Sequence, residues 1–199
     1  MRAALAVKFT ESRLGVLDNC RTTGVRGRHP RDNPALQQAF GKVQMLGMKI
    51  VVTQCIPEPH PTGIYVRPAD AWIDPSLPQE RALVTHGHAD HARGGHGHVW
   101  ATRETLAIMG LRYGTASGTA VDYGEEVRLG GVRIRYVPAG HVLGSAQILL
   151  EHAGERVVVT GDYKRRPDPT CLPFEPVPCD IFVTEATFGL PVFRHPDTG

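Results

Sequence analysis

The sequence lacks any long apolar run. A helix needs about 20 consecutive apolar residues to span a bilayer, and no stretch of the 199 residues approaches that length. Near the N-terminus the apolar run AALAV is too short for a secretory signal. We therefore expect no membrane partner and favour a cytoplasmic location.

Cysteine is scarce as well, and the C-x-x-C pattern is absent. The sequence holds four cysteines at irregular spacing: Cys20, Cys55, Cys171 and Cys179. Small secreted domains that depend on disulfides use denser cysteine frameworks. This spacing argues against a disulfide scaffold, and we expect the reduced thiols of a cytosolic protein.

A large excess of one charge is also missing, because the net charge of the chain is only +2. Residues 1–49 hold nine Lys and Arg against three Asp and Glu, whereas residues 50–199 hold 13 against 17. The body of the chain is therefore not a nucleic-acid binder by bulk charge. For the basic residues 1–47, a nucleic-acid arm and a transit peptide are alternatives. We favour a disordered leader or a mis-assigned start, because Met45 and Met48 precede the strand-like run KIVV.

From about residue 48 the sequence is typical of short strands separated by turns. GIYVRPADAWIDP predicts two strands around a turn at Pro68–Asp70, and VRLGGVRIRYV and AQILLEHAGERVVVTGD each predict a hairpin. Single strands are predicted in RALVT, VWA and DIFVTEATFG. One helix is predicted from a cap at Thr102 to about Met109, with Gly110 as its stop.

Residues of metal-ligand type lie at the ends of three predicted strands, where His86, Asp162 and Glu185 follow apolar runs. Loops that leave buried strand ends often carry catalytic groups. We therefore expect these residues to share one site. An acid at a strand end, or a single histidine in a turn, is on its own more often a local hydrogen-bonding group.

The densest signal is THGHADH, which contains four candidate metal ligands: His86, His88, Asp90 and His91. In extended backbone, positions two apart point to the same side, so His86 and His88 can close on one ion. Asp90 and His91 can serve a second ion. Imidazole nitrogen suits zinc, and a carboxylate oxygen also accepts manganese or iron.

Two later residues can complete such a pair of ions. His141 lies in a glycine-flanked loop between predicted strands and is a candidate third histidine, and Asp162 is a candidate carboxylate between the ions. The alternative for the cluster is a solvated His-rich loop, which its place after a buried-looking strand disfavours. His96 and His98 are interpreted as loop residues.

These motifs in this order resemble the metallo-β-lactamase superfamily, whose α/β (α+β) fold is a four-layer αβ/βα sandwich with a dinuclear site at its edge. Together with GIYVRPADAWIDP, AGHVLGSAQI, GDYKRRPDPT and TEATFGLPVFRHP, they resemble the bacterial ligase-associated DNA exonucleases of the β-CASP nuclease branch. The resemblance implies that residues 48–199 form an incomplete metallo-β-lactamase-like domain, truncated before the β-CASP lobe.

The resemblance also implies roles for individual residues. His86, His88 and His141 would bind one ion, Asp90 and His91 the other, and Asp162 would bridge the two. It implies two Zn²⁺ ions, with Mn²⁺ as the alternative, and a supporting catalytic role for Glu185. It favours a DNA substrate over RNA, with an ATP-dependent DNA ligase as a partner.

The residues themselves add two expectations about chemistry. Two metal ions suit phosphodiester hydrolysis, in which Asp90 could orient the attacking hydroxide. Lys164, in the basic run after Asp162, is a candidate phosphate contact. The expected function is a metal-dependent DNA exonuclease. A metallo-hydrolase of acyl or thioester compounds, and an inactive metal- or nucleic-acid-binding fragment without the second lobe, are the alternatives.

Overall fold

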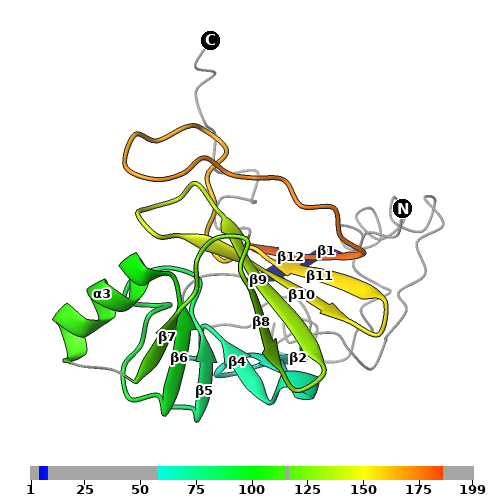
Figure 1. Cartoon of the computed structure of the whole chain (residues 1–199), viewed down its shortest axis with the longest axis horizontal. Helices are drawn as coiled ribbons and strands as arrows, with labels where there is room; N and C mark the ends of the chain where they lie inside the picture. The colour runs from blue at the N-terminus through cyan, green and yellow to red at the C-terminus, as the bar shows by residue number, and fades with distance from the viewer. Residues whose placement is uncertain (1–4, 9–57, 115–116, 186–199) are drawn as a thin grey trace, which may run out of the picture.

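The protein's computed structural model describes residues 5–8, 58–114 and 117–185, which form two six-stranded sheets (Figure 1). Sheet A has the strand order β1-β12-β11-β10-β9-β8, and sheet B has the order β2-β3-β4-β5-β6-β7. The strands of sheet A are β1 (Leu5–Lys8), β8 (Glu126–Leu129), β9 (Val132–Pro138), β10 (Ala146–His152), β11 (Glu155–Val159) and β12 (Ile181–Glu185). Those of sheet B are β2 (Glu58–His60), β3 (Gly63–Val66), β4 (Ala71–Ile73), β5 (Arg81–Leu83), β6 (His98–Ala101) and β7 (Gly118–Ala120).

The main hydrophobic core lies between the two sheets and contains residues of both. In β9, the buried side chains of Val132, Ile134 and Tyr136 alternate with Arg133 and Arg135, as the two-residue period of a strand requires. The Tyr136 hydroxyl crosses this core and donates to the backbone carbonyl of Trp100 in sheet B, at 2.7 Å. Burial raises the pKa of Tyr136 well above its usual value, which keeps this donor protonated.

The outer faces of the two sheets are covered differently. On sheet B, helix α3 (Arg103–Tyr113) buries Met109 in a second cluster with residues of β5 and β6. On sheet A, the segment between β11 and β12 covers the outer side chains of Val137 and Leu149 with Val177 and Cys179 (Figure 1). The expected α/β fold is confirmed, and the core of each layer is built from the apolar runs that predicted the strands.

The predicted strands and hairpin turns are found, but the predicted end of the helix is wrong. Thr102 caps α3 as expected, since its side chain accepts from the backbone N–H of Thr105. The helix then continues through Gly110 to Tyr113 and ends at Gly114. A glycine inside a helix costs only about 1 kcal/mol relative to alanine, and contacts of the last turn with a neighbouring loop, described below, favour its continuation.

The structure describes part of the basic N-terminal segment, residues 1–47. Residues 5–8 form β1, which pairs with β12 in parallel, with Leu5 opposite Phe182. The other residues of the predicted leader 1–47, and the strand-like run KIVV, lie outside the described residues. Among the residues that the structure describes, no helix is long and apolar enough to cross a membrane.

Candidate metal centre

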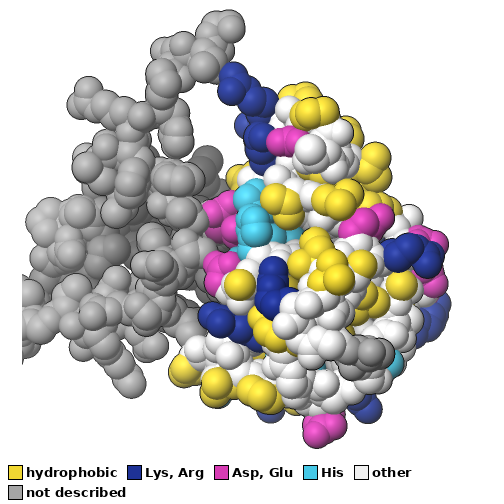
Figure 2. Space-filling model, turned by 90° about the vertical axis from the view of Figure 1, so that its left-hand side faces the viewer, with side chains coloured by type: hydrophobic (Ala, Val, Ile, Leu, Met, Phe, Trp, Pro, Cys, Tyr) yellow, Lys and Arg dark blue, Asp and Glu magenta, His cyan; other side chains and the backbone are white. Residues whose placement is uncertain are grey.

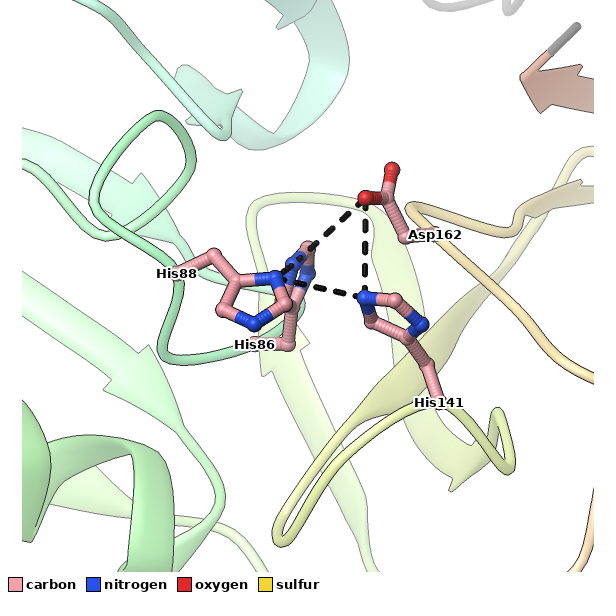
Figure 3. A group of neighbouring side chains, drawn as sticks. All are labelled: His86, His88, His141 and Asp162. Atoms are coloured by element: carbon pink, nitrogen blue, oxygen red, sulfur yellow. Dashed lines mark hydrogen bonds and ion pairs between the residues drawn. The ribbon is translucent and has the colours of Figure 1, made fainter. Parts of the chain in front are cut away.

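Four of the predicted ligands come together at one edge of the two sheets: His86, His88, His141 and Asp162 (Figure 3). The loop after β5 carries the first two, the β9–β10 loop carries the third, and the loop after β11 carries the fourth. Each residue offers one ligand atom, and these atoms all lie within 4.8 Å of one another. Figure 2 shows the histidines grouped on this face with acidic side chains beside them.

The spacing of these ligand atoms fits a single metal ion. His88 Nδ1 lies 3.0 Å from His86 Nε2 and 3.2 Å from His141 Nε2. Asp162 Oδ2 lies 3.8 Å from His86 Nε2 and 3.6 Å from His141 Nε2. Tetrahedral zinc binds imidazole nitrogen at about 2.0–2.1 Å, which separates neighbouring ligand atoms by roughly 3.3 Å. Three imidazoles and one carboxylate at these distances are therefore suited to hold a zinc-sized ion.

A second group of ligand atoms lies next to the first and shares Asp162 with it. His91 Nε2 lies 3.3 Å from Asp162 Oδ1 and 3.6 Å from Asp90 Oδ2. The other carboxylate oxygen of Asp162, Oδ2, faces the first group. The two oxygens of Asp162 therefore point to two different sets of histidines, which is the geometry of a carboxylate that can bridge two ions.

One buried carboxylate at this centre was missed by the sequence analysis. Asp74, directly after β4, is only 4% exposed and accepts from the backbone N–H and the hydroxyl of Thr85 at 2.8 and 2.7 Å. Its Oδ2 also lies 2.8 Å from His91 Nδ1. Its position after a buried strand matched the pattern that marked His86 and Asp162, and this pattern could have identified it.

Asp74 fixes which nitrogen of two histidines carries the proton. An ionised carboxylate only accepts, so His91 Nδ1 must donate to it, and in the neutral ring Nε2 then carries the lone pair. The hydroxyl of Thr85 spends its one hydrogen on Asp74, so His86 Nδ1, 3.1 Å away, donates to that hydroxyl. Hydrogen bonds of this kind orient histidine ligands and raise their basicity. Both Nε2 atoms are thereby available to a metal.

Burial favours neutral rings on His86 and His141 beside an ionised Asp162 carboxylate. Burial raises the pKa of Asp162, but His91, His86 and His141 outweigh it and bring the pKa below its usual range. Burial, and after it the neighbouring His91, lowers the pKa of His86 to about 3. Burial also lowers the pKa of His141. These are the protonation states that metal binding requires.

Gly161 places Asp162 against the histidine loop. Its φ of +55° is a conformation that favours glycine, and a Cβ at this position would lie 2.5 Å from Thr85 Oγ1. The close approach lets the chain leaving β11 pass directly over Thr85. The N–H of Thr160 still donates to the carbonyl of Val183 in β12. Only Gly161 separates this residue from Asp162, so Asp162 lies close to the end of the sheet and reaches the histidines.

Helix α3 supports two of the three ligand-bearing loops. At its start, the hydroxyls of Thr102 and Thr105 donate to the carbonyl of Gly144 in the β9–β10 loop, at 2.7 and 3.3 Å. Near its end, Arg112 Nη2 donates to the carbonyl of Gly87, between His86 and His88, at 2.9 Å. The contact of Arg112 requires the helix to run past Gly110. One helix thus sets the positions of loops that belong to different sheets.

We expect Thr102→Val to lower the free energy of unfolding by about 1–2 kcal/mol, because α3 loses its cap and the Gly144 carbonyl loses a buried donor. Urea denaturation measures the loss. The control is Arg103→Ala on the same helix, whose 3.6 Å ion pair with Asp122 joins side chains that are each 73% exposed. Such pairs contribute about 0–1 kcal/mol. Equal losses in the two variants would contradict the supporting role of the cap.

The structure places the remaining predicted residues around the centre. Glu185 ends β12 close enough to His141 for its charge to raise the pKa of that histidine. Lys164 lies beside the centre, but its Nζ is bonded to Asp168 at 2.8 Å. The roles of Glu185 in catalysis and of Lys164 in substrate binding remain predictions. His96 Nδ1 accepts from a backbone N–H in the loop before β6. The prediction of a loop was wrong for His98, which begins β6 and contacts two hydroxyls of the neighbouring segment, and both histidines lie outside the ligand groups.

Comparison with known proteins gives relatives that match about two thirds of this chain. A probable DNA ligase from Opitutus terrae is 34% identical over 142 residues, which cover 68% of this chain and 14% of the relative. Endoribonuclease YSH1 from Mycosarcoma maydis is 32% identical over 170 residues, covering 65% of this chain and 19% of the relative. The chain thus spans less than a fifth of the length of either relative.

Two further comparisons complete these findings. Among solved structures, the flavodiiron protein from Giardia intestinalis aligns at 14% identity with a TM-score of 0.35, covering 50% of this chain and 26% of its own. No family model matches the chain. The ligand motif with its shared carboxylate, the two facing sheets and the sequence relatives together show that the chain belongs to the metallo-β-lactamase superfamily, in its β-CASP branch.

Proposed function

We propose that the protein is a metal-dependent phosphodiester hydrolase that acts on nucleic acid, specifically an exonuclease for DNA ends. One observation carries the proposal: the two oxygens of Asp162 lie toward two separate groups of ligand atoms. Phosphodiester hydrolysis suits paired metals, because two bound ions would activate a water and stabilise both the attacking and the leaving oxygen. Zn²⁺ is the proposed metal, with Mn²⁺ as the alternative.

Each residue has a defined part in this proposal. His86, His88 and His141 would hold one ion, Asp90 and His91 would hold the second, and Asp162 would contribute one oxygen to each. The Asp90 side chain is 57% exposed, so it can accept a hydrogen bond from the attacking water while it contacts the centre. Glu185 adds a negative charge beside His141. Lys164 would contact a phosphate after releasing Asp168.

The relatives support nucleic acid as the substrate. These relatives are a probable DNA ligase and an endoribonuclease, which leave DNA and RNA both open for this chain. We favour DNA, with an ATP-dependent DNA ligase as the partner that seals the processed ends. We also propose a cytoplasmic location, in which the protein would have access to DNA and to the ligase.

Metal removal and substrate choice test the proposal together. We expect the chain, supplied with Zn²⁺ or Mn²⁺, to release nucleotides from end-labelled DNA, to lose this activity with a chelator, and to regain it on adding metal. The same preparations are tested on RNA and on a thioester. Faster cleavage of RNA would change the proposed substrate, whereas thioester hydrolysis without phosphodiester cleavage would contradict the proposed reaction.

A further inference from the structure

Two aromatic residues belong to the segments next to the metal centre but are not among its candidate ligands. Tyr163 follows Asp162 in the chain, and its ring contacts that of Phe174 with centroids 5.2 Å apart and a tilt of 39°. Both side chains are partly exposed. Neither ring belongs to the three buried hydrophobic clusters found among the described residues.

The loop that carries these rings is tied to the strand that leads to His141. The backbone N–H of Lys164 donates to Ala139 at 3.0 Å, and that of Glu175 donates to Pro138 at 3.1 Å. From beneath, the fully buried Gln147 donates through Nε2 to the carbonyls of Pro138 and Glu175, at 3.0 and 2.7 Å. The segments that carry the rings are therefore held in a fixed place relative to the β9–β10 loop, which contains His141.

Gly140 allows the two segments to approach this closely. It has a φ of +70°, and a Cβ on it would lie 2.7 Å from the backbone nitrogen of Phe174 and would collide with the carbonyl of Lys164. The glycine directly before His141 is thus in contact with both ends of the aromatic loop. The backbone segments that carry the two rings therefore lie against the residue that directly precedes the candidate ligand His141.

Basic side chains lie on the same loop. Arg165 and Arg166 follow Tyr163 and Lys164, and both arginines are exposed. Figure 2 shows hydrophobic and basic side chains on the face that carries the histidines. Proteins that bind single-stranded nucleic acid combine basic residues along the backbone path with aromatic rings on which unpaired bases stack.

We propose that Tyr163 and Phe174 form a stacking subsite for one unpaired nucleobase of the strand whose phosphodiester lies at the metal centre. The subsite rests on the proposed function. It takes any base with a π face, and it selects a single-stranded end over a paired one, because a paired base cannot leave its stack to reach the rings. Arg165 and Arg166 would contact the phosphates beyond that base.

A purely structural role for the rings makes a different prediction. Rings that only cover Gly140 would contribute to stability, and the protein would not distinguish a normal nucleotide from one without a base. Removing the base from the substrate therefore separates the two roles without altering the protein.

The experiment measures binding of a single-stranded oligonucleotide with a non-cleavable backbone to the zinc-loaded chain, by fluorescence anisotropy. A series carries one abasic residue at successive positions. For the wild type we expect one position at which base loss weakens binding by about 5- to 100-fold, the range given by one stacked base.

Tyr163→Leu should bind the intact oligonucleotide more weakly by a similar factor and should not respond to the abasic residue. Tyr163→Phe should restore the response, and Leu172→Ala, at a 53% exposed position in the same segment, should bind as the wild type does.

Each outcome decides the proposal. If no abasic position weakens binding to the wild type, or if Tyr163→Leu shows the same abasic penalty, the stacking subsite is wrong. Cleavage of an unmodified oligonucleotide is measured in parallel. Cleavage without any base dependence overturns the subsite and leaves the proposed function standing, whereas neither binding nor cleavage overturns both.

Discussion

Asp162→Ala should remove both metal ions and lower phosphodiester hydrolysis by about a thousandfold or more, since paired metals supply several kcal/mol of transition-state stabilisation. Its oxygens lie 3.3 Å from His91 Nε2 and 3.6 and 3.8 Å from the Nε2 atoms of His141 and His86. Its two oxygens thus face the two different ligand groups. Metal content per chain, measured after gentle purification, and hydrolysis of end-labelled DNA report the effect.

Asp168→Ala is the matched control for this variant. Asp168 lies in the same loop and bonds to Lys164 and Thr170, but it contacts none of the ligand groups. We expect it to retain the metal content of the wild type. A wild type that holds two ions and an Asp162→Ala variant that still holds two would contradict the bridging role of Asp162.

Asp74→Asn should empty the second ion position while leaving the fold intact. The amide can present its oxygen to the Thr85 N–H, and its NH₂ group must then face His91 Nδ1. That ring would have to accept at Nδ1 and carry its proton on Nε2, the atom that faces Asp162 and Asp90. Loss of such a histidine partner lowers metal affinity by about 10- to 100-fold.

Asp74→Ala should be more severe, because it removes the acceptor altogether. The Thr85 N–H and the His91 ring lose a partner in a buried place, and we expect a loss of about 3–5 kcal/mol in the free energy of unfolding. Metal titration and urea denaturation distinguish the two variants. Asp70→Ala, at a side chain 73% exposed near the start of β4, serves as control. Normal metal affinity in Asp74→Asn would show that the His91 tautomer does not depend on this carboxylate.

The sequence predicted the strands and most of the centre because both signals are local. Two-residue alternation marks strands such as β9. The six positions from His86 to His91 bring four candidate ligands together without tertiary information. His141 and Asp162 needed only the further expectation that loops at strand ends meet. Parallel pairing of β4 with β5, with Ile73 opposite Leu83, brings Asp74 beside Thr85, and this register is not visible in the sequence.

The end of α3 and the pairing of Lys164 could not be predicted from the sequence, because both depend on contacts made only in the folded chain. Gly110 is a local stop signal, but Arg112 reaches the Gly87 carbonyl only in the folded chain. Lys164 is a basic residue after a ligand motif, and its bond to Asp168 depends on the path of the loop between them. In the first case a tertiary contact overrides the local stop signal, and in the second it adds a partner for Lys164 that the local pattern does not reveal.

The hydrogen-bonded series from His86 through Thr85 and Asp74 to His91 has a consequence for how the sequence can change over time. All four side chains are at most 4% exposed, so water cannot replace a missing partner. A change at any one of them leaves a donor or an acceptor unpaired, and the effects of two changes within the series will not add. The four positions are therefore constrained to vary together or not at all, although Asp74 lies eleven residues before the THGHADH motif that contains the other three.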